Sequence, residues 1–337
     1  MSLPERLLLI RNDKLGDFML AWPAFALAKA ALPKTRIEAL VPAYTRPLAE
    51  QCPWLDGIID DPGGEWRELV PRLKGVDAAI ALFSTVRVAR ALRAAKVPYR
   101  LAPATKWFQI FYNHRLRQRR SRSVKPEFEY NLDLVRHYLH GLGITPPEEA
   151  LIRPFWRFPA REIEAERRRM AGKHRLDPAR PWVLLHPGHG GSASNLSPQA
   201  YAELAAALEP RAQIVVGAGP GEVETAHELA AALRGKGRAA VVQADHADVV
   251  AYARIIACMA VFIGGSTGPL HLAGALDVPT AGFYPRGRVT SGLRWRTLNS
   301  PGRYLAFSPP PTAGENEMAA IDLAAAARRI NARFLSS

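Results

Sequence analysis

The 337-residue chain is poor in cysteine and contains no long apolar run. Its two cysteines, Cys52 and Cys258, stand far apart and lack the spacing of metal ligands, so neither a disulfide framework nor a zinc site is expected. No stretch reaches the roughly 18 apolar residues needed to cross a bilayer, and residues 1–10 lack the layout of a signal peptide. These absences predict a protein of a reducing compartment, the cytoplasm.

Acidic residues are few relative to basic ones. The chain has 31 Asp and Glu residues and 45 Lys and Arg residues, which gives a formal net charge of +14. No Asp-x-Asp sequence occurs, so a metal–diphosphate clamp of that type is excluded and no metal is predicted. The excess of positive charge predicts an anionic partner, which could be nucleic acid, an anionic membrane face or a phosphorylated substrate.

The positive charge is concentrated in one stretch. From Arg100 to Lys125 there are eight basic residues and no acidic one. Four aromatic residues lie between them, namely Trp107, Phe108, Phe111 and Tyr112. Basic residues with interspersed aromatics suit nucleic acid, and they equally suit a membrane surface, where aromatic rings lie at the level of the headgroups.

Short, mainly apolar segments alternate with helical patterns along the chain. Such segments are typical of parallel strands that are covered on both faces, and they occur at residues 7–10, 37–41, 57–60, 78–83, 182–186, 213–216, 240–242, 261–263 and 280–284. The alternation predicts an α/β fold with parallel sheets and crossover helices. Prolines between residues 146 and 159 mark a linker. Since one core rarely exceeds ~250–300 residues, we predict domains at 1–155 and 156–315, followed by a C-terminal helix within 316–337.

The loop after the first strand carries charged residues. Arg11 and Lys14 suit an anion, and Asp17 stands where a helix begins. Asp is a favoured N-cap residue, so Asp17 is either a cap or a catalytic carboxylate that the helix dipole stabilises.

Three loops of the second half are rich in glycine, which lets backbone N–H groups approach an anion closely. One loop holds Gly188, Ser192 and Ser194. A second loop, Gly264 to Gly268, opens a helix, and there we predict an anion hole for a diphosphate. The candidates for the diphosphate site are Gly188, Ser192, Ser194, Ser266, Thr267, Gly268 and His271. His271 alone could equally be a core histidine. The third loop offers Gly217, Glu222 and, further on, His246 as candidates for binding a nucleoside, although a plain turn is the simpler interpretation.

These motifs resemble a known family. The segment Leu8-Leu9-Ile10-Arg11 followed by Leu15-Gly16-Asp17, the His186-Pro187-Gly188 loop and the run from Ser266 to Ala273 are similar to the motifs of the heptosyltransferases, glycosyltransferase family 9. The resemblance implies the GT-B fold, with two facing Rossmann-like domains, a central cleft and a C-terminal helix that crosses back onto the N-terminal domain. It also implies inverting, metal-independent transfer of heptose from ADP-heptose to the inner core of lipopolysaccharide.

The resemblance also implies roles for single residues. Asp17 matches the family's proposed general base, and Thr267, Gly268 and His271 match the donor diphosphate site. Family members often carry Lys where this chain has Ser194 and Asp where it has Ser266. Another nucleotide-sugar donor therefore stays open, as does replacement of the lysine by Arg286 or Arg288.

The partners follow from the same assignment. No cofactor is expected beyond the nucleotide-sugar co-substrate. A phosphorylated lipid or oligosaccharide acceptor would bind the N-terminal domain through Arg11, Lys14, Arg115, Arg117, Arg119 and Arg120. We expect a monomer on the anionic cytoplasmic face of the inner membrane, and no nucleic acid. Two alternatives remain at this point, a GT-B epimerase and a nucleic-acid-binding protein that uses the stretch from Arg100 to Lys125.

Overall fold

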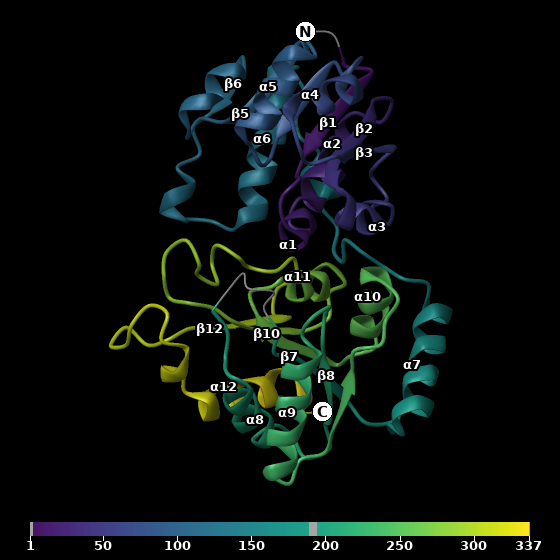
Figure 1. Ribbon diagram of the computed structural model, residues 1–337, viewed down its shortest axis with the longest axis vertical. Coiled ribbons are helices and arrows are strands. Elements are labelled where there is room, and N and C mark those ends of the chain that lie inside the picture. Colours follow the sequence, from purple (N-terminus) through teal and green to yellow (C-terminus); the bar gives the residue numbers. More distant parts are fainter. Residues whose placement is uncertain (1–2, 189–193, 337) are drawn as a thin grey trace. The chain divides into compact units, whose positions relative to one another are not determined.

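In the computed structural model, which describes residues 3–188 and 194–336, the chain divides between Ile152 and Arg153 into two units (Figure 1). The division falls within the predicted proline-rich linker. Each unit is built around one parallel sheet, as the alternation of apolar strands and helices predicts.

The first unit has a six-stranded sheet in the order β3-β2-β1-β4-β5-β6, and all its strand pairs are parallel. The strands are β1 (Arg6–Ile10), β2 (Arg36–Pro42), β3 (Gly57–Asp61), β4 (Ala78–Ala81), β5 (Tyr99–Pro103) and β6 (His114–Leu116). The helices are α1 (Leu15–Met19), α2 (Trp22–Ala31), α3 (Arg46–Ala49), α4 (Trp66–Leu69), α5 (Val86–Ala94) and α6 (Glu127–Gly141). The central strands β1 and β4 are buried along almost their whole length, which explains their lack of apolar–polar alternation.

The second unit repeats this arrangement. Its sheet has the order β12-β11-β10-β7-β8-β9, again with parallel pairs only. The strands are β7 (Trp182–His186), β8 (Gln213–Gly217), β9 (Ala240–Gln243), β10 (Val261–Gly265), β11 (Thr280–Phe283) and β12 (Tyr304–Phe307). The helices are α7 (Ala160–His174), α8 (Pro198–Ala206), α9 (Val223–Gly235), α10 (Val249–Ala257), α11 (Gly268–Ala275) and α12 (Leu323–Ile330). In both units the chain starts at the middle of the sheet, proceeds to one edge and then returns to build the other half, as in doubly wound folds.

Short helical turns complete the two units: η1 (Ala43–Thr45), η2 (Val70–Leu73), η3 (Trp107–Phe111), η4 (Arg120–Arg122), η5 (Glu148–Ala150), η6 (Met318–Ala320) and η7 (Asn331–Leu335). No helix in the described ranges combines the length and apolarity required to span a bilayer.

Two details differ from the sequence prediction. The helix that the sequence places at Asp17 is followed at once by a second one, since α1 ends at Met19 and α2, with Pro23 in its first turn, begins at Trp22. The basic stretch, in which no strand is predicted, contains β5 and β6. Both strands are short, and β6 is a half-exposed edge strand without an apolar run that would identify it.

The C-terminal helix α12 packs within the second unit. That residues 316–337 also pack back on the N-terminal domain stays a prediction. Ala326, Ala327 and Ile330 of α12 belong to the core of the second unit. Asn331 then fixes the end of this helix to the segment after α8, since its side-chain amide donates to the Ala207 carbonyl at 3.0 Å. Its side-chain oxygen accepts from the Glu209 N–H at 2.9 Å.

Candidate active site

In each unit, some of the predicted site residues lie at or after the ends of the two central strands. Neighbouring parallel strands whose connections lead to opposite sides of the sheet leave a crevice at their carboxyl ends, where ligands of doubly wound proteins bind. Arg11 follows β1 and Leu82 follows β4, and these strands are neighbours. His186 ends β7 and Ser266 follows β10, which are neighbours as well. The topology thus places the candidates of each unit where a ligand would be expected.

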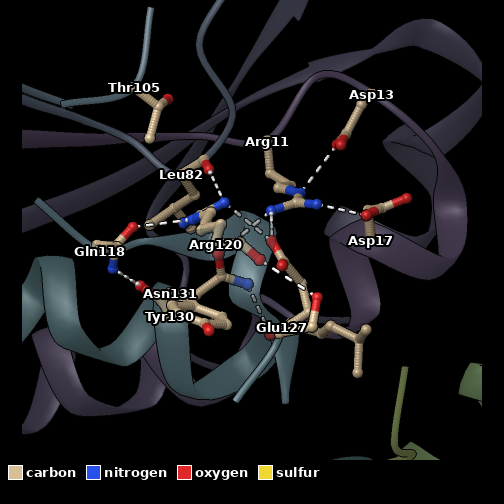
Figure 2. Close-up of polar contacts among 12 residues, drawn as sticks. Arg11, Asp13, Asp17, Leu82, Thr105, Gln118, Arg120, Glu127, Tyr130 and Asn131 are labelled. Carbon is tan, nitrogen blue, oxygen red and sulfur yellow. Dashed lines mark hydrogen bonds and ion pairs between the residues drawn. The ribbon is translucent and has the colours of Figure 1, made fainter. Parts of the chain in front are cut away.

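A buried arginine organises the site of the first unit (Figure 2). The side chain of Arg11 is only 3% exposed. Its Nε donates to Asp13 at 2.9 Å, and one terminal nitrogen donates to Glu127 at 2.9 Å and to Asn131 at 3.2 Å. Its other terminal nitrogen forms an ion pair with Asp17. One guanidinium therefore holds three carboxylates in fixed positions.

The charges of this cluster shift one another's pKa values. Burial alone would lower the pKa of Arg11, but the neighbouring carboxylates raise it above its ordinary value, so Arg11 stays protonated. Burial, opposed by the charge of Arg11 and reinforced by that of Asp17, raises the pKa of Asp13 to about 7. Asp13 and Asp17 share the same cation, Arg11.

Asp17 is not the N-cap of its helix. Lys14 occupies the cap position of α1, and Asp17 is the third helical residue. One oxygen of its carboxylate binds Arg11, and the other points away from the guanidinium (Figure 2). The side chain is 14% exposed, so it combines fixed orientation with access from solvent. This arrangement suits a proton acceptor better than a helix cap.

The arginines predicted to bind the acceptor fall into two groups. Arg120 points inward and donates to the carboxylate of Glu127 at 3.0 Å and to the carbonyl of Leu82 at 3.1 Å. Arg11 and Arg120 thus flank Glu127 inside the unit. The remaining candidates, Lys14, Arg115, Arg117 and Arg119, are exposed.

In the second unit, the start of α11 presents two buried polar groups. The hydroxyl of Thr267 and the Nδ1 atom of His271 have no hydrogen-bond partner within the described residues. Thr267 is the N-cap of α11, Gly268 and Pro269 follow it, and Ser266 is half-buried beside it. A buried polar group without a partner is costly, so these atoms mark a place where a polar ligand would complete the structure. The N-terminus of the helix favours an anion at the same place.

His271 acts there as a neutral group. Burial lowers its pKa to about 4, so the imidazole is uncharged at neutral pH in the ligand-free protein. It can therefore donate a hydrogen bond to a diphosphate. It does not supply a fixed positive charge.

Acidification should lower the stability of the second unit. The pKa values of His271 and His186 are both lowered to about 4 by burial, whereas unfolded histidine titrates near ~6.5. Between these values the unfolded state binds protons that the native state does not, so native stability falls as the pH drops from about 6.5 to 4. We expect amide exchange in peptides covering β7 and α11 to accelerate over this range, and less so in His271→Gln. Equal acceleration in both proteins would contradict the assignment of His271.

The predicted nucleoside residues gather at the ends of β7 and β8. His186 contacts the Tyr252 hydroxyl at 2.9 Å, and its other ring nitrogen lies 3.4 Å from the carboxylate of Glu222. His246 stacks on Tyr252 with ring centroids 4.7 Å apart. Gly217 lies against the same tyrosine, since a Cβ atom there would come within 2.2 Å of the hydroxyl oxygen. Gly217, Glu222 and His246 therefore form one cluster around His186 and Tyr252.

The glycine-rich loop after β7 is only partly described. A Cβ atom on Gly188 would lie 2.1 Å from the Glu222 carboxylate, so this glycine joins the loop to the nucleoside cluster. Ser192 lies outside the described residues. Ser194 is exposed. The next residue, Asn195, anchors the loop instead, because its amide donates to the Pro187 carbonyl at 2.8 Å.

Arg286 and Arg288 differ in their surroundings. Arg286 is half-buried and donates to the Ala313 carbonyl at 3.0 Å. Arg288 is exposed. Replacement of a family lysine by one of these two arginines stays a prediction.

The sequence prediction missed several residues of these clusters, among them Glu127 and Asn131. They lie four residues apart on the buried face of α6, beside apolar residues such as Leu134. Residues with this spacing share one face of a helix, and two polar residues on an otherwise apolar face indicate an internal partner. That signal was present in the sequence, but Arg11 as the partner was not recognisable from it.

Comparisons with known proteins agree with this architecture. The sequence profile of glycosyltransferase family 9 (heptosyltransferase) matches residues 66–302. A Haemophilus influenzae protein described provisionally as a glycosyltransferase is 44% identical over 316 residues, which cover 91% of this chain and 90% of that protein.

Solved structures extend the comparison to the fold. The structure of Escherichia coli ADP-heptose LPS heptosyltransferase II is similar with a TM-score of 0.76 at 21% identity, over 97% of this chain and 98% of that one. The structure of Escherichia coli heptosyltransferase WaaC with ADP has a TM-score of 0.70 at 16% identity, over 97% of this chain and 99% of that one. The predicted fold class, α/β of the GT-B type, is thereby confirmed.

Proposed function

The chain belongs to glycosyltransferase family 9, and we propose that it transfers heptose from ADP-heptose to a hydroxyl group of a phosphorylated lipopolysaccharide core. The first unit supplies the base for the acceptor, and the second unit binds the donor. The observation that carries this proposal is the placement of Asp17, held by Arg11 at the end of β1, together with the buried Thr267 and His271 at the end of β10.

The chemistry needs two functions. The acceptor oxygen attacks the anomeric carbon while the bond from that carbon to the diphosphate oxygen breaks, and the configuration at the carbon inverts. Asp17 takes the proton of the acceptor hydroxyl, and ADP leaves with the bonding electron pair. The Thr267 hydroxyl, the N–H groups at the start of α11 and the neutral imidazole of His271 donate hydrogen bonds to the negative charge that develops on the leaving diphosphate.

Adenosine would bind at the ends of β7 and β8. Glu222 is the acceptor available there for ribose hydroxyl groups, and Tyr252 fixes the neighbouring His186 and His246. That the WaaC heptosyltransferase structure contains ADP supports a nucleotide-sugar co-substrate. The acceptor would carry its lipid in the cytoplasmic leaflet of the inner membrane, so we place the enzyme, as a monomer, at that surface.

The proposed reaction is tested with purified protein, ADP-heptose and a deacylated phosphorylated core oligosaccharide. We expect ADP to be released only when donor and acceptor are both present, and the oligosaccharide to gain the mass of one heptose. Conversion of the free nucleotide sugar without an acceptor would favour an epimerase. Transfer from a different nucleotide sugar would overturn the donor assignment and retain the transferase.

The donor site gives a separate prediction. Thr267→Val removes a hydroxyl with little change in shape, and His271→Leu removes the ring N–H. Since a hydrogen bond to a charged group contributes ~1.5–3 kcal/mol, each variant should bind ADP roughly 10- to 100-fold more weakly in calorimetry. Thr290→Val, at an exposed threonine of the same unit, is the matched control and should bind ADP normally. Unchanged affinity in both site variants would remove α11 from the donor site.

A further inference from the structure

The basic stretch divides into an inner and an outer set of side chains once it is folded. Phe108 and Tyr112 are buried in the core of the first unit, and Arg120 points inward to Glu127. By contrast, Trp107 is 71% exposed and Ile110 is 64% exposed. Among the four aromatic residues that the sequence singles out, only Trp107 presents most of its surface to solvent, and Ile110 is an apolar neighbour that the sequence pattern does not reveal.

Trp107 and Ile110 share one face because of the helix type. Both belong to η3, a 3₁₀ helix with three residues per turn, in which positions i and i+3 lie directly above one another. The next pair with this spacing, Phe108 and Phe111, packs against the core. The turn therefore has one face anchored in the unit and an opposite face that carries two large apolar side chains.

Exposed basic residues lie on neighbouring segments at the same edge of the sheet. Strands β5 and β6 pair in parallel with Pro103 opposite Leu116, and the Ala104 N–H donates to the Leu116 carbonyl at 2.8 Å. The segments that follow the two strands consequently leave the sheet side by side. The exposed basic residues on and after these strands are Lys106, Arg115, Arg117, Arg119 and Arg122. Among residues 3–188 and 194–336, no ion pair involves any of these five.

We infer that Trp107 and Ile110, together with Lys106, Arg115, Arg117, Arg119 and Arg122, form a surface that docks on an anionic lipid bilayer. This docking surface deepens the proposed function, since it names where the enzyme would meet the membrane that carries its acceptor. Arginine and lysine are attracted to anionic headgroups, and a tryptophan ring settles at the interface between headgroups and acyl chains. Ile110 decides between a bilayer and nucleic acid, because an aliphatic side chain offers no stacking surface to a base but gains from burial among acyl chains.

The docking surface is tested by co-sedimentation of the full chain with vesicles, without donor or acceptor. We expect binding to vesicles of phosphatidylglycerol and phosphatidylethanolamine, little binding to phosphatidylcholine alone, and weaker binding as salt is raised. Trp107→Ser with Ile110→Ser, and separately Arg117→Gln with Arg119→Gln, should each weaken binding about tenfold.

Matched control variants distinguish binding through the docking surface from nonspecific binding to vesicles. Ile152→Ser changes an isoleucine that is as exposed as Ile110, at 66%, and that is the last residue of the first unit. Arg161→Gln with Arg168→Gln removes the same charge from exposed positions of α7. Both should bind like the parent chain, and circular dichroism should show all four variants folded.

The outcomes are distinct from those that test the reaction. No binding to anionic vesicles, equal losses in the controls, or tighter binding to a DNA duplex than to vesicles would each overturn the docking surface. None of these results would affect heptose transfer to a water-soluble acceptor, which tests the proposed function itself. Conversely, selective vesicle binding by a chain that fails to transfer heptose would support the docking surface alone.

Discussion

Replacing Asp17 with Asn should lower turnover by about two to four orders of magnitude, which is the usual size of the contribution of a general base. Asn keeps the side-chain oxygen that accepts from Arg11, so the geometry of the site should survive, but the group can no longer take a proton. Affinity for ADP should be unchanged, because the donor residues belong to the second unit. The measurement is steady-state release of ADP with a saturating acceptor, together with calorimetry of ADP binding.

Asp13→Asn is the control that the structure offers. Asp13 accepts a hydrogen bond from Arg11 Nε at 2.9 Å, and Asp17 pairs with the same guanidinium, so this variant changes a second carboxyl group of the same cluster. We expect Asp13→Asn to retain turnover within about tenfold of the parent enzyme, since only Asp17 is assigned proton transfer. If Asp13→Asn were as inactive as Asp17→Asn, the charge balance around Arg11 would explain both losses and the base would have to be sought elsewhere. Unimpaired turnover in Asp17→Asn would exclude the base role directly.

The sheets were predictable because their central strands are buried on both faces. Segments such as residues 7–10 and 182–185 are wholly apolar, and the structure places them in β1 and β7, at the middle of the sheets. Edge strands lack this property, since β6 and β12 are half-exposed and β6 has only three residues. Sequence periodicity therefore identified the middle of each sheet and missed parts of the edges.

The site was predictable only in its local parts. Asp17 and Thr267 lie at the start of the first helices after β1 and β10, and the rule that ligands bind at the carboxyl ends of parallel strands points to them. The partner of Arg11 could not be predicted in this way, because Glu127 lies 116 residues away along the chain. No local pattern encodes that pairing. The same applies to Arg120, which the sequence groups with the exposed arginines and which tertiary packing turns toward Glu127.

The Arg11–Glu127 pairing also gives the largest expected effect on stability. Arg11→Met should destabilise the first unit by about 3–5 kcal/mol, because removing one partner of a buried ion pair leaves the other charges uncompensated. Glu127 is 1% exposed and would keep its ion pair with Arg120, while Asp13 and Asp17 would lose their ion pairs with Arg11. Hydrogen exchange in peptides covering α6 measures this loss in the first unit without contribution from the second.

Two further variants distinguish charge from geometry in that cluster. Arg11→Lys keeps the positive charge but has no planar fork to bind Asp13, Asp17 and Glu127 at once, so it should recover only part of the lost stability. Glu127→Gln combined with Arg11→Met should be less destabilising than the sum of the two single changes, since the double variant no longer buries an unpaired carboxylate at position 127. Full additivity would mean that the two residues do not act as a pair. A loss below about 1 kcal/mol in Arg11→Met would show that the carboxylates find other counter-charges, and the fixed orientation of Asp17 would then need another cause.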